Sequence, residues 1–156
     1  MMNLRIQDVM RCKNVARWHI VDCIKGQSLA EHNFNVAMIG AAIAIKKGVD
    51  PKPVMVAALL HDLSEVLTGD LPPTTKKVFG YRDPTVSVLG HLVVDLDPQV
   101  QHILKLADLV DAIAHLELYG HGRHALRVHE NLNRKIDDQD AVDVLNHGCH
   151  GKDSLF

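Results

Sequence analysis

The sequence predicts an all-α protein, a single helical domain of about six helices spanning residues 1–156. Apolar stretches recur at helical spacing, and aspartate–proline pairs or glycines stand at several of their ends. No segment sustains the alternation of a strand, and no repeat, low-complexity tract or linker divides the chain. A chain of 156 residues is long enough to fold as one domain around its own core.

Two helices are expected in the first half of the chain. Residues 29–48 are rich in alanine and apolar around most of the helical circumference, and Gly48 provides a natural end. Asp50 can then cap a second helix, because Pro51 fits the first turn. This helix is expected over about 50–67, with a glycine just beyond it.

The second half is expected to hold three more helices after a loop. Residues 71–84 contain three prolines and a glycine, which predicts a loop with at most a short turn of helix. A moderate helix is expected over 85–96. A second aspartate–proline pair then starts a long helix over 98–120, and a last helix is expected over about 123–146.

Composition and charge exclude several classes of function. A net charge of −2 gives no electrostatic reason to bind a nucleic acid polymer or an anionic membrane. No apolar run is long enough to span a bilayer, and the first residues lack the apolar core of a signal peptide. Three widely spaced cysteines suggest a reducing compartment. The expected location is the cytoplasm, that of the host cell if the source is viral.

The stretch HDLSEVLTGD at 61–70 carries the first chemical signal. It follows an apolar run that is typical of a buried helix, and burying ionisable groups costs free energy unless they are paired. His61 and Glu65 stand four residues apart and therefore share a helical face. Asp62 lies about 100° around the same helix, so it can reach an ion near the edge that it shares with His61. An adjacent histidine–aspartate pair alone is weak evidence for a metal site, because such pairs are common on protein surfaces.

Two other helices offer groups that would complete a metal site with His61 and Asp62. His32 lies near the start of the alanine-rich helix, and Asp108 interrupts the apolar stretch LKLADLVDAIA. Two imidazoles and two carboxylates suit a divalent transition ion that keeps positions open for water and substrate. Asp111 is a rival to Asp108, because it falls on the same helical face and periodicity does not separate the two. Asp111 could also support a ligand by a hydrogen bond.

Four motifs in this order resemble the HD-domain metal-dependent phosphohydrolases. They are RW at 17–18, EH at 31–32, HDLSEVLTGDLP at 61–72 and KLAD at 105–108. Within that family the chain is similar to the bacterial 5′-deoxynucleotidases and to the phage dATP triphosphohydrolases, over about residues 10–120. Its short length favours the compact phage branch.

The resemblance implies a divalent metal ion as cofactor, which would polarise a phosphoryl oxygen and lower the pKa of a water. The implied ligands are His32, His61, Asp62 and Asp108. Zinc, cobalt, manganese and iron all tolerate this set, and magnesium could accompany the substrate phosphates. The spacing after KLA selects Asp108 over Asp111 by resemblance.

The resemblance also implies roles for two acidic residues near the metal. Glu65 matches the residue that orients or deprotonates the attacking water, whereas without the neighbouring HD pair it would be an ordinary exposed glutamate. Asp70 matches the residue that binds the 3′-hydroxyl of the sugar. A turn or cap role after a glycine is the alternative for Asp70, and both roles could hold together.

Arg17, Trp18 and Ile20 are expected on the substrate side. The resemblance places Trp18 against the nucleoside, where it would stack on the base and crowd the 2′ position. A lone tryptophan is equally often a core anchor. Ile20 would line the same pocket if the segment is extended, and would exclude a base with a 2-amino group.

Two lysines bear on the number of phosphates in the substrate. Lys105 precedes Asp108 by three residues and so shares its face, while Lys76 follows Asp70 in the loop. Together with Arg17 they mildly favour a triphosphate over a monophosphate. Solvated lysines are the alternative, and that alternative is strong for Lys76.

The sequence therefore predicts hydrolysis of a deoxynucleotide at the 5′-O–P bond, with dATP converted to deoxyadenosine and triphosphate. A 5′-deoxynucleotidase acting on monophosphates is the second hypothesis, and a phosphodiesterase is a weaker one. A non-catalytic module that binds a nucleotide is an alternative of another class, which the intact ligand set and Glu65 oppose. The expected partners are a small-molecule deoxynucleotide and further copies of the chain in a homo-oligomer.

Overall fold

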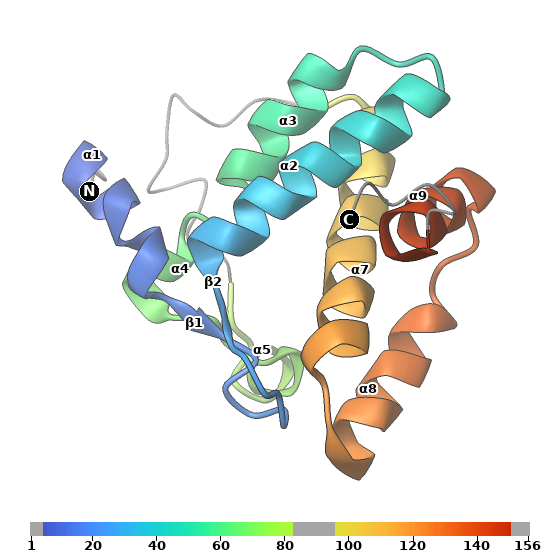
Figure 1. Ribbon diagram of the computed structural model, residues 1–156. Helices are drawn as coiled ribbons and strands as arrows, with labels where there is room; N and C mark the ends of the chain where they lie inside the picture. Colours follow the sequence, from blue (N-terminus) through green and yellow to red (C-terminus); the bar gives the residue numbers. More distant parts are fainter. Residues whose placement is uncertain (1–4, 83–95, 151–156) are drawn as a thin grey trace.

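The computed structural model describes residues 5–82 and 96–150, and these residues confirm the all-α class. Figure 1 shows α7 (Pro98–Tyr119) running through the middle of the molecule, with α2 (Leu29–Lys46) crossing it and α3 (Pro51–Leu60) packed along α2. Among the described helices, none is long and apolar enough to cross a membrane. The helix expected over 85–96 falls almost wholly outside the described residues.

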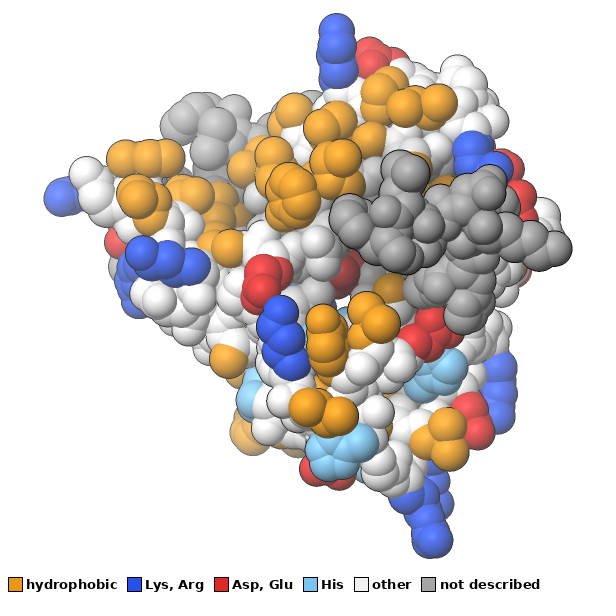
Figure 2. Space-filling model, in the orientation of Figure 1, with side chains coloured by type: hydrophobic (Ala, Val, Ile, Leu, Met, Phe, Trp, Pro, Cys, Tyr) orange, Lys and Arg blue, Asp and Glu red, His pale blue; other side chains and the backbone are white. Residues whose placement is uncertain are grey.

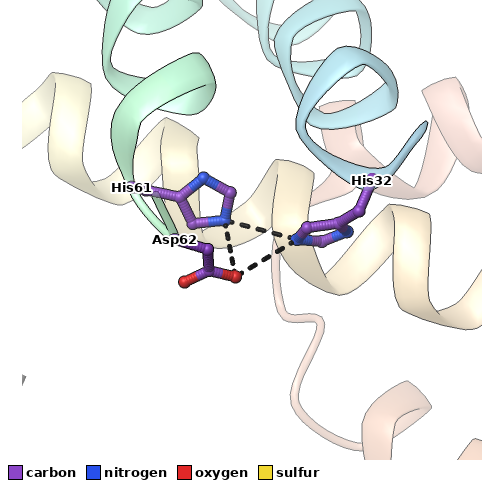
Figure 3. A group of neighbouring side chains, drawn as sticks. All are labelled: His32, His61 and Asp62. Carbon is purple, nitrogen blue, oxygen red and sulfur yellow. Dashed lines mark hydrogen bonds and ion pairs between the residues drawn. The ribbon is translucent and has the colours of Figure 1, made fainter. Parts of the chain in front are cut away.

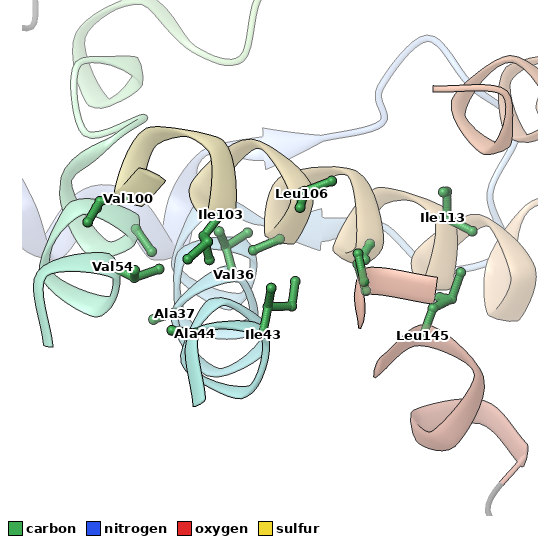
Figure 4. Packing of buried hydrophobic residues seen from close by; sticks show 14 residues of the cluster. Val36, Ala37, Ile43, Ala44, Val54, Val100, Ile103, Leu106, Ile113 and Leu145 are labelled. Atoms are coloured by element: carbon green, nitrogen blue, oxygen red, sulfur yellow. The ribbon is translucent and has the colours of Figure 1, made fainter. Parts of the chain in front are cut away.

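The core lies where these three helices meet, and α9 closes one side of it (Figure 4). Aliphatic side chains without any exposure fill this space because removing apolar surface from water is the main force for folding. The fully buried members include Val36, Ile43, Val54, Ile103 and Ile113. The core fixes the mutual placement of the helix ends that carry the candidate ligands.

α2 begins and packs as its sequence dictates. Ser28 accepts a hydrogen bond from the backbone N–H of Glu31, and the Glu31 carboxylate accepts one from the backbone of Ser28. This capping box fixes the first turn, from which His32 projects. Further along, Gly40 lets α3 approach closely, because a Cβ there would lie 2.7 Å from Cγ1 of Val54.

The single helix expected over 50–67 is wrong, because α3 ends at Leu60 and a separate short helix, α4, covers Glu65–Thr68. Backbone hydrogen bonds across 60–67 join each residue to the third one before it, which is the tighter 3₁₀ pattern. Asp62 therefore lies in a turn, with its Oδ2 3.4 Å from Nε2 of His61.

The single helix expected over 123–146 is also wrong. The chain forms α8 (Gly122–Asn133) and α9 (Gln139–His150). Asp138 explains the restart, because its side chain accepts a hydrogen bond from the backbone N–H of Ala141. Lys47 binds Asp138 at 2.7 Å and Asp140 at 3.0 Å, which ties the start of α9 to the end of α2.

Short elements complete the N-terminal part and the predicted loop. α1 (Ile6–Val9) and a 3₁₀ helix, η1 (Met10–Asn14), precede two antiparallel strands. β1 (Ala16–Arg17) pairs with β2 (Gln27–Ser28), and two residues are too few for the alternation that reveals a strand in sequence. α5 (Pro73–Val78) is the short helical turn within the loop expected over 71–84.

Candidate metal centre

Two imidazoles and a carboxylate from separate elements converge on one point. His32 lies on α2, His61 follows the last residue of α3, and Asp62 is in the turn beyond it (Figure 3). Their Nε2, Nε2 and Oδ2 atoms are 3.3 to 3.6 Å apart in pairs. These three residues offer ligand atoms close enough together to hold a metal ion.

The hydrogen bonds on the opposite ring nitrogens determine which nitrogen of each histidine carries the proton. His61 Nδ1 lies 2.7 Å from the carbonyl oxygen of Ala58, and His32 Nδ1 lies 2.6 Å from a carboxylate oxygen of Asp111. Both partners accept hydrogen bonds, so each Nδ1 is the donor. In the neutral rings both Nε2 atoms then carry lone pairs, and these are the atoms that face each other. Two lone pairs directed at one point are the arrangement of metal ligands.

Asp108 and Asp111 lie on different sides of His32. Oδ1 of Asp108 is 3.4 Å from His32 Nε2, and its side chain is 46% exposed. Asp108 lies outside the group of three whose ligand atoms are all close to one another. Asp111 is buried and contacts Nδ1 instead. The two aspartates thus have separate tasks: Asp108 could act as a fourth ligand, and Asp111 orients the His32 ring.

The spacing of His32, His61 and Asp62 fits a small cation. Tetrahedral bonds of about 2.0–2.1 Å would separate neighbouring ligand atoms by about 3.3 Å, and the three ligand atoms are 3.3, 3.4 and 3.6 Å apart in pairs. The local charge favours a cation as well. Burial lowers the pKa of His32, but Asp111 and Asp62 outweigh it and raise that pKa overall. Burial raises the pKa of Asp62, but His32, His61 and Arg17 outweigh it and hold that pKa well below its usual range.

Glu65 is the ionisable group next to this set. It is buried, and two cations lie beside it: Lys76 Nζ at 3.3 Å and Arg17 at 3.8 Å. Burial, together with the charges of Asp62 and Asp70, raises the pKa of Glu65 to about 7. No described residue donates a hydrogen bond to its Oε2, which is buried and lies 3.8 Å from Nη1 of Arg17. A carboxylate with this pKa is suited to general-base chemistry near neutral pH.

Arg17 and Lys76 meet at this site, as the sequence suggested, and Asp70 lies near them. Arg17 donates a hydrogen bond to Asp62 at 3.1 Å, and Lys76 contacts Glu65. Asp70 follows Gly69, whose φ of +72° turns the chain after α4, and is half-buried. Lys105 is exposed, one turn before Asp108 on α7.

Trp18 and Ile20 lie in a turn, which differs from the extended segment considered for them. Val21 donates its backbone N–H to the Trp18 carbonyl, and Ile20 is 56% exposed. Trp18 has a φ of +64°, a conformation that costs on the order of 1 kcal/mol for a residue with a Cβ. Its ring stacks on His115 with centroids 5.5 Å apart and planes 3° from parallel. Trp18 is half-buried.

Sequence reasoning missed two residues that support the centre. Gln27 and Asn35 both donate hydrogen bonds to Asp111, Gln27 at 2.9 and 3.2 Å and Asn35 at 2.9 Å. Neither amide stands in a sequence pattern that marks it as part of a site.

Comparison with known proteins agrees with the motifs. The family model described as 5′-deoxynucleotidase YfbR-like matches residues 6–82. A dATP triphosphohydrolase of Acinetobacter phage SH-Ab 15497 is 30% identical over 163 residues, covering 86% of this chain and 79% of the relative. The 5′-deoxynucleotidase PM0747 of Pasteurella multocida is 30% identical over 131 residues, covering 65% and 67%.

A solved structure shares the fold. The HD phosphohydrolase DatZ of Cyanophage S-2L, bound to dA and one catalytic Zn²⁺ ion, superposes with a TM-score of 0.75 at 23% identity. The match covers 95% of each chain. At this identity the likeness establishes the fold of the chain.

Proposed function

Because this chain belongs to the YfbR-like family of HD-domain phosphohydrolases, we propose that it hydrolyses dATP to deoxyadenosine and triphosphate with a divalent metal ion. The proposal rests above all on one observation: the Nε2 atoms of His32 and His61 face each other, 3.3 Å apart, beside the carboxylates of Asp62 and Asp108. Relatives that carry out metal-linked nucleotide hydrolysis support the same reading.

The residues of the chain divide the work as follows. When bound to His32, His61, Asp62 and Asp108, the metal supplies Lewis-acid activation of a phosphoryl oxygen and of water. Glu65 accepts the proton of the attacking water. Burial and the neighbouring acidic groups raise its pKa above that of an ordinary glutamate, which makes its carboxylate a stronger base.

The remaining site residues bind the nucleotide. Arg17, Lys76 and Lys105 provide positive charge for the phosphates. A triphosphate carries its negative charge on three phosphate groups and therefore has room for several such cations. In this proposal Asp70 accepts a hydrogen bond from the 3′-hydroxyl, and Trp18 forms a wall against the nucleoside.

A 5′-deoxynucleotidase is the second candidate, since the same groups can cleave the 5′-O–P bond of a monophosphate and a bacterial relative has that name. Two features favour the triphosphate. Lys76 lies beside Glu65 and adds a cation at the site, and phage dATP triphosphohydrolases match most of the chain. Relatives from phages also support the host cytoplasm as the place of reaction.

A substrate screen tests this proposal. The purified protein is incubated with deoxy- and ribonucleoside mono- and triphosphates and with zinc, cobalt, manganese or iron, and both nucleoside and phosphate products are measured. We expect dATP to be the preferred substrate. Orthophosphate released from dAMP would favour the second candidate. Metal and nucleotide binding without turnover of any substrate would show a non-catalytic module.

We also infer that the chain forms a homo-oligomer through the outer face of α2. Along α2 no charged residue occurs between Asn35 and Lys46, yet Phe34, Met38 and Ile45 are 61%, 51% and 66% exposed. Figure 2 shows hydrophobic side chains gathered over α2 and α3. A helix that is apolar all round is normally covered on every side.

A second copy fits this face because the face complements itself. Antiparallel pairing of two α2 helices about a two-fold axis would set Phe34 of each copy opposite Ile45 of the other, and Glu31 near Lys46. Met38→Glu, at the centre of the face, should convert the assembly to monomers in sedimentation measurements. Ile6→Glu, an exposed position on α1, is the control. A monomeric wild type at micromolar concentration, or an unchanged Met38→Glu assembly, would contradict this interface.

A further inference from the structure

Gln27 occupies a position of the small sheet that reaches the candidate metal centre. In the antiparallel register of β1 and β2, Gln27 stands directly opposite Arg17. Residues opposite each other in such a pair project to the same side. From this side Arg17 reaches Asp62, and Gln27 reaches Asp111. The two strands therefore support the centre from two directions, although each is only two residues long.

The side chain of Gln27 joins two groups of opposite hydrogen-bonding character. Its Oε1 accepts a hydrogen bond from the indole Nε1 of Trp18 at 3.3 Å, and its Nε2 donates to both carboxylate oxygens of Asp111. An indole can only donate, and an ionised carboxylate can only accept. A primary amide can accept from the indole and donate to the carboxylate at once. A carboxylate in its place would repel Asp111, and an ammonium group would leave the indole without an acceptor. Gln27 is 5% exposed, so water does not readily replace it.

Each end of this bridge leads to a functional part of the site. Asp111 contacts Nδ1 of His32, whose other nitrogen faces His61 and Asp62. Trp18 is held in a left-handed backbone conformation, with its ring stacked on His115. His115 is itself held by a contact between its Nε2 and the Lys25 carbonyl at 3.1 Å. The hydrogen bond that the indole Nε1 donates to Gln27 holds a second part of the ring.

We infer that Gln27 is a positioning residue that holds the nucleoside wall and a metal ligand in register through a single amide. It orients Trp18 against His115, and it orients Asp111 against His32. Loss of the amide then loosens metal binding and the discrimination against the 2′-hydroxyl together. The second consequence rests on the proposed function, whereas the orientation of Trp18 and the effect on metal binding do not.

The first test uses the fluorescence of Trp18, the only tryptophan of the chain. Gln27→Met keeps a similar volume and removes both hydrogen bonds. In the metal-free protein we expect lower fluorescence anisotropy and stronger quenching by acrylamide than in the wild type. Asn35→Leu is the control, because it removes a donor to Asp111 and leaves the Trp18 bond intact. Its fluorescence should match that of the wild type.

The second test measures metal affinity and selectivity on the same variants. A supporting hydrogen bond to a metal-ligating histidine is typically worth about 10–100-fold in metal affinity. Gln27→Met and Asn35→Leu should both weaken zinc binding, measured by competition with a chelator, by up to this factor. Only Gln27→Met should also lower the ratio of kcat/KM for dATP to that for ATP, by about fivefold, the equivalent of one neutral hydrogen bond.

The outcomes separate this inference from the proposed function. Wild-type fluorescence and zinc affinity in folded Gln27→Met would overturn the positioning role, even in an enzyme that hydrolyses dATP. Loss of selectivity in Asn35→Leu to the same degree would overturn it too, because a general structural effect would then suffice. A protein that hydrolyses no nucleotide would refute the proposed function while the fluorescence and zinc results still decide the role of Gln27. If Gln27→Met fails to fold, Gln27→Asn takes its place, since the shorter amide cannot reach both partners.

Discussion

His32 has different partners on its two ring nitrogens, and this division organises the candidate centre. Nδ1 contacts the buried Asp111, while Nε2 faces His61, Asp62 and Asp108. Helical periodicity could not separate Asp108 from Asp111, because residues three apart share one face of a helix, and only the resemblance of the KLAD motif selected Asp108. Which of them faces which nitrogen depends on how α7 is rotated against α2, and that rotation is fixed by the packing of the core.

Asp108 and Asp111 should respond differently to substitution. We expect Asp108→Ala to lose metal binding under conditions that saturate the wild type, because a direct ligand is removed. Asp111→Ala should retain metal with an affinity reduced by about 10–100-fold, because only the support of His32 is lost. Chelator competition with zinc measures both constants. The reverse ranking would exchange the two roles.

Glu65 should affect turnover far more than binding. We expect Glu65→Gln to bind metal and nucleotide while losing roughly two to four orders of magnitude in kcat, the usual contribution of a general base. The rate of the wild type should rise with pH as this carboxyl ionises, at or below pH 7, since a bound cation would lower the pKa of about 7 found without metal. The residual rate of Glu65→Gln should lack this rise. Loss of metal from the variant would indicate that Glu65 is a ligand.

At the residue level, the sequence pattern identified ionisable residues that stand within apolar helices. His32, His61 and Asp62 were recognisable because ionisable groups interrupt apolar helices, and the structure brings them together. Gln27 and Asn35 were not recognisable, because an amide can serve almost any surface position. Their importance comes from Asp111, a buried carboxylate that needs donors, and this need is visible only in three dimensions.

At the level of elements, the two long central helices were predictable, and the wrong predictions share one cause. α2 and α7 have strong starts, at Ser28 and at Asp97-Pro98, and long apolar faces. The breaks after Leu60 and Asn133 fall inside sequences that favour helix, so the helical periodicity predicted one continuous helix at each place. In both places polar groups compete locally with the helix: His61 binds the Ala58 carbonyl, and Asp138 caps α9.

The contact between α2 and α3 gives a prediction at this scale. Gly40→Ala should gain helix propensity of up to about 1 kcal/mol. The new Cβ would nevertheless lie 2.7 Å from Cγ1 of Val54, and forcing an extra methyl into a packed core costs about 1–3 kcal/mol. We expect net destabilisation in urea unfolding. Adding Val54→Ala should make Gly40→Ala less harmful than it is alone, and simple additivity of the two would contradict the contact.

At the scale of the whole molecule, the candidate centre exists only in the assembled fold. His32 comes from α2, Asp108 from α7, and His61 with Asp62 from the turn after α3. An unfolded chain cannot hold these ligands together, so metal binding must stabilise the native state by linkage. The fold class was predictable because it depends on the helical periodicity of the chain as a whole. The site depends on how three helices are rotated relative to one another, which periodicity does not give.

Zinc should therefore raise the melting temperature of the metal-free protein. At a free zinc concentration of 100 times the Kd, the gain in unfolding free energy is about 2.7 kcal/mol. Calorimetry with increasing zinc measures it, and His61→Ala should show little of the gain. An equal response in that variant would mean that zinc binds elsewhere.

The central claim is that a water, assisted by Glu65 at a metal held by four residues, attacks the α-phosphorus of dATP. The most direct test is hydrolysis of dATP by the metal-loaded protein in ¹⁸O-labelled water, with the products resolved by phosphorus NMR and mass spectrometry. The predicted result is deoxyadenosine without label and inorganic triphosphate with one labelled oxygen. Release of orthophosphate with dADP, or label in the deoxyadenosine, would contradict the claim.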